Sequence, residues 1–299
     1  MSISKTNPTT TPLLRLGMAM WSLPQWQRSL LQACPTPASR LAAYAEKFTT
    51  VEGNTSFYAL PDANTVAMWA DSVPDSFRFT FKLPKTVTHQ LMLRHCDTEL
   101  SQFFQRMQPL QAHTSIWKIQ LPATFGPESL VVLADFLPRL PAALQFAVEV
   151  RHAAFFAKGA AEQQLNRLLI DNGCDRIIMD SRPIFAKPAV TEVMRDAQTK
   201  KPRVPVHAIA TAEQPVVRFI GDLIQANNDT FFAPWLSKLS QWLNEGKTPH
   251  LFVHTPDNIH APELAHRLYQ QLQQHIATHL SWQLTDLIPL QNEEQQSLF

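Results

Sequence analysis

The sequence predicts a single (β/α)₈ barrel of the TIM type, and three observations support this fold class. Eight short apolar runs recur at spacings of about 30 to 40 residues, and most intervals between them carry a helical apolar period. The length of 299 residues fits one barrel domain with short extensions. Hydrophobic residues make up 45% of the chain, which is enough for a large core. The eight predicted strands are Arg15–Trp21, Thr49–Asn54, Arg78–Lys82, Ser115–Leu121, Gln145–Arg151, Arg176–Ser181, Pro215–Gly221 and His250–Thr255.

The intervals between these strands contain segments with helical periodicity. Asn64 is expected to cap the second helix, and Asn172-Gly173 and Glu245-Gly246 are expected to end the fifth and sixth. The predicted helices are Ser39–Phe48, Asn64–Val73, Thr98–Leu110, Pro127–Leu137, Glu162–Asn172, Ala233–Glu245 and Pro262–His279.

Composition limits the classes of function and the cellular setting. The formal net charge of +1 gives no general affinity for polyanions, although a local basic patch is compatible with it. The cysteines Cys34, Cys96 and Cys174 are isolated, which argues against a disulfide framework or a zinc knuckle. We find neither a signal peptide nor an apolar stretch of membrane-spanning length. We therefore expect a soluble cytoplasmic protein with no membrane partner.

Two segments stand apart from the strand–helix repeat. Arg182–Gln214, after the sixth strand, is long and rich in proline, and it carries the basic run Lys200-Lys201-Pro202-Arg203. It is either a functional lid or binding loop, or a surface excursion with solvated charges. The Gln/Glu-rich residues 281–299 are expected to form a flexible tail. The barrel domain is therefore expected to span residues 13–280.

One face of each predicted strand is unusually polar for the inside of a barrel. Successive side chains alternate between the faces of a strand, so one set meets the helices and the other lines the barrel. Because the opposite face is strongly apolar, we expect the polar set to point inward. Such barrels carry their active sites at the carboxyl ends of the strands. The inward residues expected there are Trp21, Glu52, Asn54, Lys82, Gln120, Glu149, Arg151, Asp180, Arg218 and His254.

Two interpretations of this ring stay open. Charges in neighbouring strands, such as Glu52 beside Lys82 and Lys118 beside Glu149, are able to satisfy one another as a structural network. Alternatively the ring is a ligand site, which we favour because many of these residues lie at strand ends, where a scaffold does not need them.

An anion site is the chemistry that we prefer for the ring. Lys82, Arg151 and Arg218 are suited to hold a phosphate or carboxylate, with arginine giving bidentate contacts. By residue type and position, the catalytic candidates are Glu149 or Glu52 as general base, His89 or Tyr58 as acid, and Asp180 as a further carboxylate. The candidates for substrate contact are Trp21, Asn54, Lys82, Gln120, Arg151, Arg218, His254 and Asn258.

A divalent metal is the less favoured alternative, and no cofactor is predicted. Glu52, Glu149, Asp180 and His254 end four strands and are able in principle to converge on one ion. The interleaved lysine and arginines would repel such a cation. Two classes of function therefore remain. One is an enzyme for an anionic substrate, of which a nucleic-acid-derived compound is one example, and the other is a non-catalytic adaptor module.

Several short motifs together resemble a known family. The chain carries Val51-Glu52-Gly53-Asn54-Thr55-Ser56-Phe57-Tyr58, Lys82-Leu83-Pro84 with Thr88-His89, Gln120-Leu121-Pro122, Glu149-Val150-Arg151-His152, Val217-Arg218-Phe219-Ile220-Gly221 and His254-Thr255-Pro256-Asp257-Asn258. In this combination the chain resembles the domain-of-unknown-function-72 (YecE-like) family. The resemblance implies a TIM-like barrel, and it supplies no established activity and therefore no catalytic roles.

The chain departs from the family pattern at three places. It has Gly53 where the family usually has an aliphatic residue, and Ile220 where a histidine usually precedes the glycine of the seventh strand. The usual asparagine pair of the eighth strand is not matched at His254-Thr255. Any chemistry that depends on the family histidine must differ in this chain.

The last five residues of the sequence resemble a second known pattern. Gln295-Gln296-Ser297-Leu298-Phe299 is similar to the Gln-x-Ser/Asp-Leu-Phe peptide with which bacterial replication and repair proteins dock on the DNA sliding clamp. In such docking Leu298 and Phe299 would enter an apolar groove and Gln295 would hydrogen-bond at its edge. The sequence therefore offers the sliding clamp as a candidate partner, and a chance match of so short a peptide is the alternative.

Overall fold

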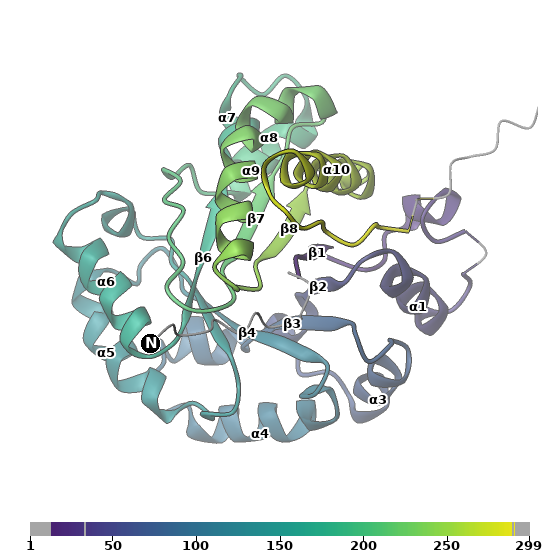
Figure 1. Ribbon diagram of the computed structural model, residues 1–299. Helices are drawn as coiled ribbons and strands as arrows, with labels where there is room; N and C mark the ends of the chain where they lie inside the picture. Colours follow the sequence, from purple (N-terminus) through teal and green to yellow (C-terminus); the bar gives the residue numbers. More distant parts are fainter. Residues whose placement is uncertain (1–12, 33, 289, 291–299) are drawn as a thin grey trace, which may run out of the picture.

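Eight parallel strands form one sheet whose order is β1-β8-β7-β6-β5-β4-β3-β2. The computed structural model describes residues 13–32, 34–288 and 290 (Figure 1). The prediction of an eight-stranded barrel is confirmed, with strand ends shifted by a few residues. The strands are β1 (Arg15–Met18), β2 (Thr50–Gly53), β3 (Arg78–Lys82), β4 (Thr114–Gln120), β5 (Phe146–Glu149), β6 (Asp175–Asp180), β7 (Val216–Ile220) and β8 (His250–His254).

Helices surround the sheet in the predicted intervals (Figure 1). Gly173 and Gly246 have φ angles of 60° and 81°, which fits their predicted role at helix ends. The cap predicted at Asn64 is wrong, because the Asp62 side chain accepts the hydrogen bond from the Thr65 amide. The helices are α1 (Pro37–Lys47), α2 (Thr55–Tyr58), α3 (Ala63–Asp71), α4 (Asp97–Met107), α5 (Leu130–Phe136), α6 (Ala160–Asp171), α7 (Arg182–Phe185), α8 (Glu192–Lys200), α9 (Asp229–Asn244) and α10 (Ala261–His279).

A tyrosine hydroxyl lies in the seam where β1 meets β2. Tyr44 Oη of α1 accepts a hydrogen bond from the Met18 amide at 2.8 Å and donates one to the Thr50 carbonyl at 3.0 Å. The β2 backbone passes so close to β1 that a Cβ at Gly17 would lie 2.0 Å from the Thr50 oxygen. Closure of the barrel therefore depends on a residue without a side chain and on a bridging hydroxyl.

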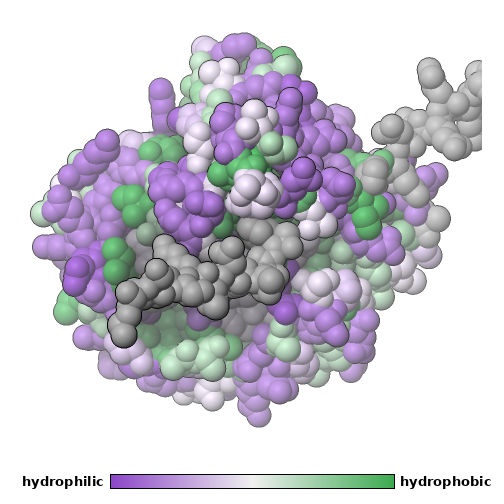
Figure 2. Space-filling view, in the orientation of Figure 1, coloured by the Kyte–Doolittle hydropathy of each residue, from purple (hydrophilic) through white to green (hydrophobic). Residues whose placement is uncertain are grey.

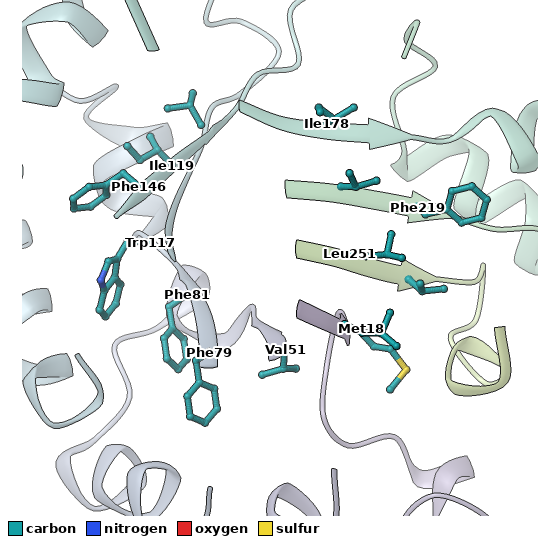
Figure 3. Packing of buried hydrophobic residues seen from close by; sticks show 14 of the residues in the cluster. Met18, Val51, Phe79, Phe81, Trp117, Ile119, Phe146, Ile178, Phe219 and Leu251 are labelled. Carbon is teal, nitrogen blue, oxygen red and sulfur yellow. The ribbon is translucent and has the colours of Figure 1, made fainter. Parts of the chain in front are cut away.

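The main core lies between the strands and the helices. Figure 3 shows Phe79, Phe81 and Trp117 on the side of β3 and β4 that faces the surrounding helices. Inside the barrel, a small apolar cluster fills the middle, made of Ile116, Ala147, Ile177, Val216 and Phe252. Polar residues lie above and below this cluster, so the barrel is a packed core with a polar layer toward the carboxyl ends of the strands.

The assignment of faces on β6 is the one strand orientation that the sequence predicted wrongly. Ile177 belongs to the interior cluster, so Arg176, Ile178 and Asp180 face the helices. Arg176 donates to Glu162 of α6 at 2.9 Å and to the Phe155 carbonyl at 2.7 Å. A buried arginine that finds its carboxylate on a helix has no need to point into the barrel.

The long segment after β6 contains two short helices, α7 and α8, which lie beyond the tips of β6 and β7 (Figure 1). Met194 and Ala197 of α8 pack with Met179 of β6 and Ile220 of β7 in a buried cluster. The segment therefore covers one side of the barrel mouth.

Residues 281–288 lie against the barrel body. Tyr269 Oη of α10 donates to the Thr285 carbonyl at 2.7 Å, and Leu284 is buried. None of the helices in the described part of the chain is both long and apolar enough to span a membrane.

Candidate functional site

A cluster of buried and half-buried polar and charged residues lies at the carboxyl ends of the strands. Its members come from β2, β3, β4, β5, β7 and β8, and one comes from the segment after β6. We call this group the mouth cluster, and it comprises Glu52, Lys82, Lys118, Gln120, Glu149, Arg151, Lys201, Arg218 and His254.

Glu52 lies at the centre of the cluster and is fully buried. Its Oε1 forms an ion pair with Lys118 and lies 2.9 Å from Arg218 Nε. Its Oε2 lies 3.3 Å from His254 Nε2. Burial raises the pKa of this carboxyl, but Arg218 and Lys118 outweigh the effect and hold it well below its ordinary value. Glu52 is therefore a fixed anion.

Glu149 is the second buried carboxylate, and it holds two guanidinium groups. Arg151 donates to its Oε1 through Nε at 3.0 Å and Nη2 at 2.8 Å, and Arg218 Nη1 donates to its Oε2 at 2.8 Å. Burial raises the pKa of Glu149, but Arg218 and then Arg151 lower it below the ordinary value. A carboxylate so fully paired is a weak base, which does not favour the predicted general-base role for either glutamate.

Lys82 differs from Lys118, Arg151 and Arg218 because no described carboxylate forms an ion pair with it. Its Nζ donates to the amide oxygen of Gln120 at 2.7 Å and lies 5.7 Å from the centre of the Phe57 ring. Burial, and then the charge of Arg218, lower the pKa of Lys82 to about 7. Near neutral pH this amine is therefore divided between its charged and neutral forms.

Lys201 is the member of the cluster that the sequence analysis did not single out. It follows α8, and the Ser181 hydroxyl at the end of β6 fixes the adjacent Pro202 by donating to its carbonyl at 2.8 Å. Burial, and then the charge of Arg218, lower the pKa of Lys201 to about 8. Glu52, Glu149 and Arg151 also act on this group, which indicates that it faces the cluster. The basic run was the only signal for it in the sequence.

The balance of charge in the mouth cluster is positive. Two carboxylates face five cationic groups, so three positive charges remain when both Lys82 and Lys201 are protonated. Burial lowers the pKa of His254 to about 3, so this histidine is neutral. The excess is this large because Asp180 is absent from the cluster and Lys201 is present.

His89 lies near this charge and Tyr58 does not. His89 belongs to a π-helical turn, Thr86–Gln90, and burial followed by the charge of Arg151 lowers its pKa. Tyr58 is 79% exposed and lies on the rim of a separate hollow of about 310 Å³. The structure therefore brings His89, but not Tyr58, toward the mouth cluster.

Three predicted substrate contacts have structural roles instead. Trp21 lies beyond the end of β1 and outside the barrel. Its ring packs edge-on against the Trp69 ring, with 5.2 Å between the ring centres. The Asn54 amide donates to the Ala19 carbonyl at 2.7 Å and joins the ends of two strands. Asn258 has a φ of 59°, and its side chain accepts from the Thr255 amide in the turn after β8. The predicted inward orientation of Trp21 is wrong because β1 ends at Met18 and the alternation stops there.

The prediction that Asp180 lines the mouth is also wrong. Its Oδ2 accepts hydrogen bonds from Trp235 Nε1 of α9 at 2.8 Å and from Arg182 Nη2 at 2.6 Å. The four-residue set considered for a divalent metal is therefore not assembled. Nowhere in residues 13–32 or 34–288 do three metal-binding side chains converge.

Gln295, Leu298 and Phe299, which the sequence predicts to bind a partner, lie outside the described residues. Figure 2 shows one face of the protein, on which hydrophilic residues predominate and apolar residues form only small areas.

A family model described as "Protein of unknown function DUF72" matches residues 15–286. The chain belongs to the DUF72 family. The resemblance noted in the sequence is thereby confirmed, and the matched range includes the whole mouth cluster.

Curated relatives and solved structures agree with this assignment. The UPF0759 protein YecE of Escherichia coli strain K12 is 47% identical over 260 residues, which is 87% of this chain and 93% of that protein. The protein of the same name from Escherichia coli O157:H7 is 46% identical over 260 residues, which is again 87% of this chain and 93% of that protein. A DUF72 family protein from Enterococcus faecalis V583 superposes with a TM-score of 0.65 at 20% identity, covering 87% of this chain and 97% of that structure. A DUF72 family protein from Thermotoga maritima MSB8 gives 0.64 at 19% identity, covering 87% and 99%.

The structure shows what surrounds two of the residues that depart from the family pattern, Gly53 and Ile220. A Cβ at Gly53 would lie 2.3 Å from the Phe81 ring, so this ring occupies the space of a side chain at position 53. Ile220 packs in the apolar cluster with Met179 and Met194. The seventh strand therefore brings only Arg218 to the polar site.

Proposed function

We propose that this DUF72 protein is an enzyme that binds a small anionic substrate, bearing a phosphate or carboxylate, in the mouth cluster. The observation that carries the proposal is a pair of lysines, the buried Lys82 and the half-buried Lys201, for which the described residues offer no carboxylate partner. A purely structural ion-pair network needs no excess of enclosed cations. An anionic ligand would supply the missing charge.

Arg151 is the group best placed to meet such a ligand first. Its side chain is 28% exposed, whereas those of Glu149 and Arg218 are almost fully buried. Glu149 fixes the guanidinium through Nε and Nη2, which leaves Nη1 free of hydrogen bonds to the described residues. A fixed guanidinium with a free edge is a suitable donor for a phosphate or carboxylate oxygen.

The experiment is a calorimetric titration with inorganic phosphate, and with a nucleoside monophosphate beside its uncharged nucleoside. Arg151→Ala should weaken phosphate binding by about 1–3 kcal/mol, roughly 5- to 150-fold, because a charge-assisted hydrogen bond is lost. Arg167→Ala is the control, since Arg167 lies on α6 with a side chain 77% exposed. Equal affinities for the wild type and Arg151→Ala would contradict the anion site.

A second candidate function is a non-catalytic adaptor in DNA metabolism. The observation that favours it is the peptide Gln295-Gln296-Ser297-Leu298-Phe299, with its likeness to sliding-clamp ligands. An adaptor would bind the clamp through this peptide and would turn over no substrate at the mouth. Screening the purified protein for phosphodiesterase and nuclease activity, with Lys82→Arg as the site variant, separates the two functions.

A further inference from the structure

We propose that Lys82 is a nucleophilic amine that forms an imine with an aldehyde or ketone carrying an anionic group. The inference rests on the proposed anion site and deepens it by naming the class of substrate. Lys82 would attack the carbonyl carbon, and Arg151 and Lys201 would hold the phosphate or carboxylate.

The first support is the position of Lys82. It is the last residue of β3, at the end of the barrel where such folds place reacting groups. Its strand holds the side chain in place, and its Nζ has one hydrogen-bond acceptor in the described structure, the neutral amide oxygen of Gln120. An amide oxygen accepts from a neutral amine as well as from an ammonium group, so this contact does not require the charged form.

The second support is that both nearby carboxylates are already occupied. Glu52 is taken by Lys118 and Arg218, and Glu149 by Arg151 and Arg218. Neither forms an ion pair with Lys82 in the described structure, although the charges of both raise its pKa and so oppose the larger effects of burial and Arg218. Lys118 is paired with Glu52 and is only 1% exposed, whereas Lys82 has no such pair and is 8% exposed. Of these two lysines, Lys82 is therefore the one better able to react with a ligand.

The third support is the environment of the amine. An apolar ring and other cations both favour the neutral form of a lysine, which is the nucleophilic form. The pKa of about 7 agrees with this arrangement. The groups that act on Lys82 are Phe57, Gln120, Arg218, Glu149, Lys118, Glu52 and the nearby His89.

The step is balanced without an oxidant or reductant. The neutral amine adds to the carbonyl carbon, and the nitrogen proton passes to the oxygen to give a carbinolamine. The carbinolamine hydroxyl then takes up one proton from solvent, the carbon–oxygen bond breaks, one water molecule leaves, and the nitrogen keeps its remaining proton in a protonated carbon–nitrogen double bond. This protonated imine withdraws electrons from the neighbouring carbon, which is the usual purpose of lysine imines in enzymes.

The test uses pyridoxal 5′-phosphate as an aldehyde with a phosphate, and pyridoxal as the same aldehyde without it. The full chain is treated with each reagent near neutral pH, sodium borohydride reduces the imine to a stable amine, and mass spectrometry of peptides locates the label. Lys82 should be labelled before the exposed Lys187, and about tenfold faster by the phosphate-bearing reagent.

Variants and pH give independent readouts. Lys82→Arg keeps a cation and removes the primary amine, so the fast label should disappear, while Lys187→Arg should keep it. Lys201→Met should reduce the advantage of the phosphate-bearing reagent. Labelling of Lys82 should reach half its maximum near pH 7, in line with its pKa of about 7, whereas an ordinary exposed lysine needs much more alkaline solution.

The outcomes separate the two proposals. Labelling of Lys187 as fast as Lys82, or labelling of Lys201 in its place, would overturn the assignment of Lys82 even if inorganic phosphate still binds through Arg151. Fast labelling of Lys82 by both reagents alike, with no phosphate binding, would support the reactive amine and overturn the anion site.

Discussion

Arg218 of β7 and Glu149 of β5 are joined across the intervening strand β6, with Nη1 of the arginine 2.8 Å from Oε2 of the glutamate. The contact is possible because β6 directs Asp180 toward α9 and leaves the apolar Met179 on the inner side. This ion pair fixes the orientation of both side chains in the mouth cluster.

Replacement of Glu149 by glutamine should lower the free energy of unfolding by about 3–5 kcal/mol, because half-buried Arg151 loses its carboxylate partner and buried Arg218 keeps only Glu52. The same change should strengthen phosphate binding, since the cluster becomes more positive. Urea unfolding and phosphate titration measure the two effects. Glu213→Gln is the control, because the Glu213 side chain is 78% exposed and its pair with Lys247 should contribute little. Wild-type stability of Glu149→Gln would mean that the pair does not support the fold.

The pH dependence of stability should reveal Asp175, a buried residue at the amino end of β6. Its Oδ1 accepts from the Gln214 amide, and burial raises its pKa from 3.8 to about 7. The folded state thus holds this proton more tightly than the unfolded state. The resulting stabilisation is complete below about pH 4 and is lost as the pH rises through 7.

Asp175→Asn should therefore be more stable than the wild type above pH 7, by at most about 4 kcal/mol, and the advantage should disappear near pH 4. Urea unfolding across this range provides the measurement. Asp171→Asn on α6, where the side chain is 51% exposed, should leave the profile unchanged. Parallel profiles for the wild type and Asp175→Asn would contradict the prediction.

The close approach of β1 and β2 predicts that a methyl group added at Gly17 destabilises the fold much more than one added at Gly159. Gly17→Ala should destabilise the fold by about 3 kcal/mol, because the new Cβ would meet the Thr50 carbonyl at 2.0 Å. Gly159→Ala should have little effect, since no atom lies within 4 Å of a Cβ placed there. Thermal unfolding of both variants tests the prediction, and similar melting temperatures would show that the seam is able to widen.

The C-terminal peptide predicts binding to the DNA sliding clamp. We expect a micromolar dissociation constant, about −8 kcal/mol, for so short an anchor, and loss of binding in a chain that ends at Ser297. Titration of the purified clamp with both chains is the measurement. The idea fails if truncation leaves the affinity unchanged or if the intact chain does not bind.

The sequence by itself determined the positions of all eight strands and the inward orientation of the polar residues on most of them. It did so because strand periodicity is local and the outward faces, such as Phe79 and Phe81, are strongly apolar. It therefore located Glu52, Lys82, Glu149 and Arg218 at one end of the barrel.

Tertiary structure alone decided the rest of the site. Periodicity identifies the polar face of β6, but it does not show whether that face packs against the helices or lines the barrel. Hydrogen-bond partners of Arg176 and Asp180 come from α6 and α9, outside their own strand. Lys201 reaches the mouth because α8 packs on Met179 and Ile220, an arrangement that no local pattern encodes. A buried charge faces whichever element offers it a partner, and that choice is made only when distant segments pack together.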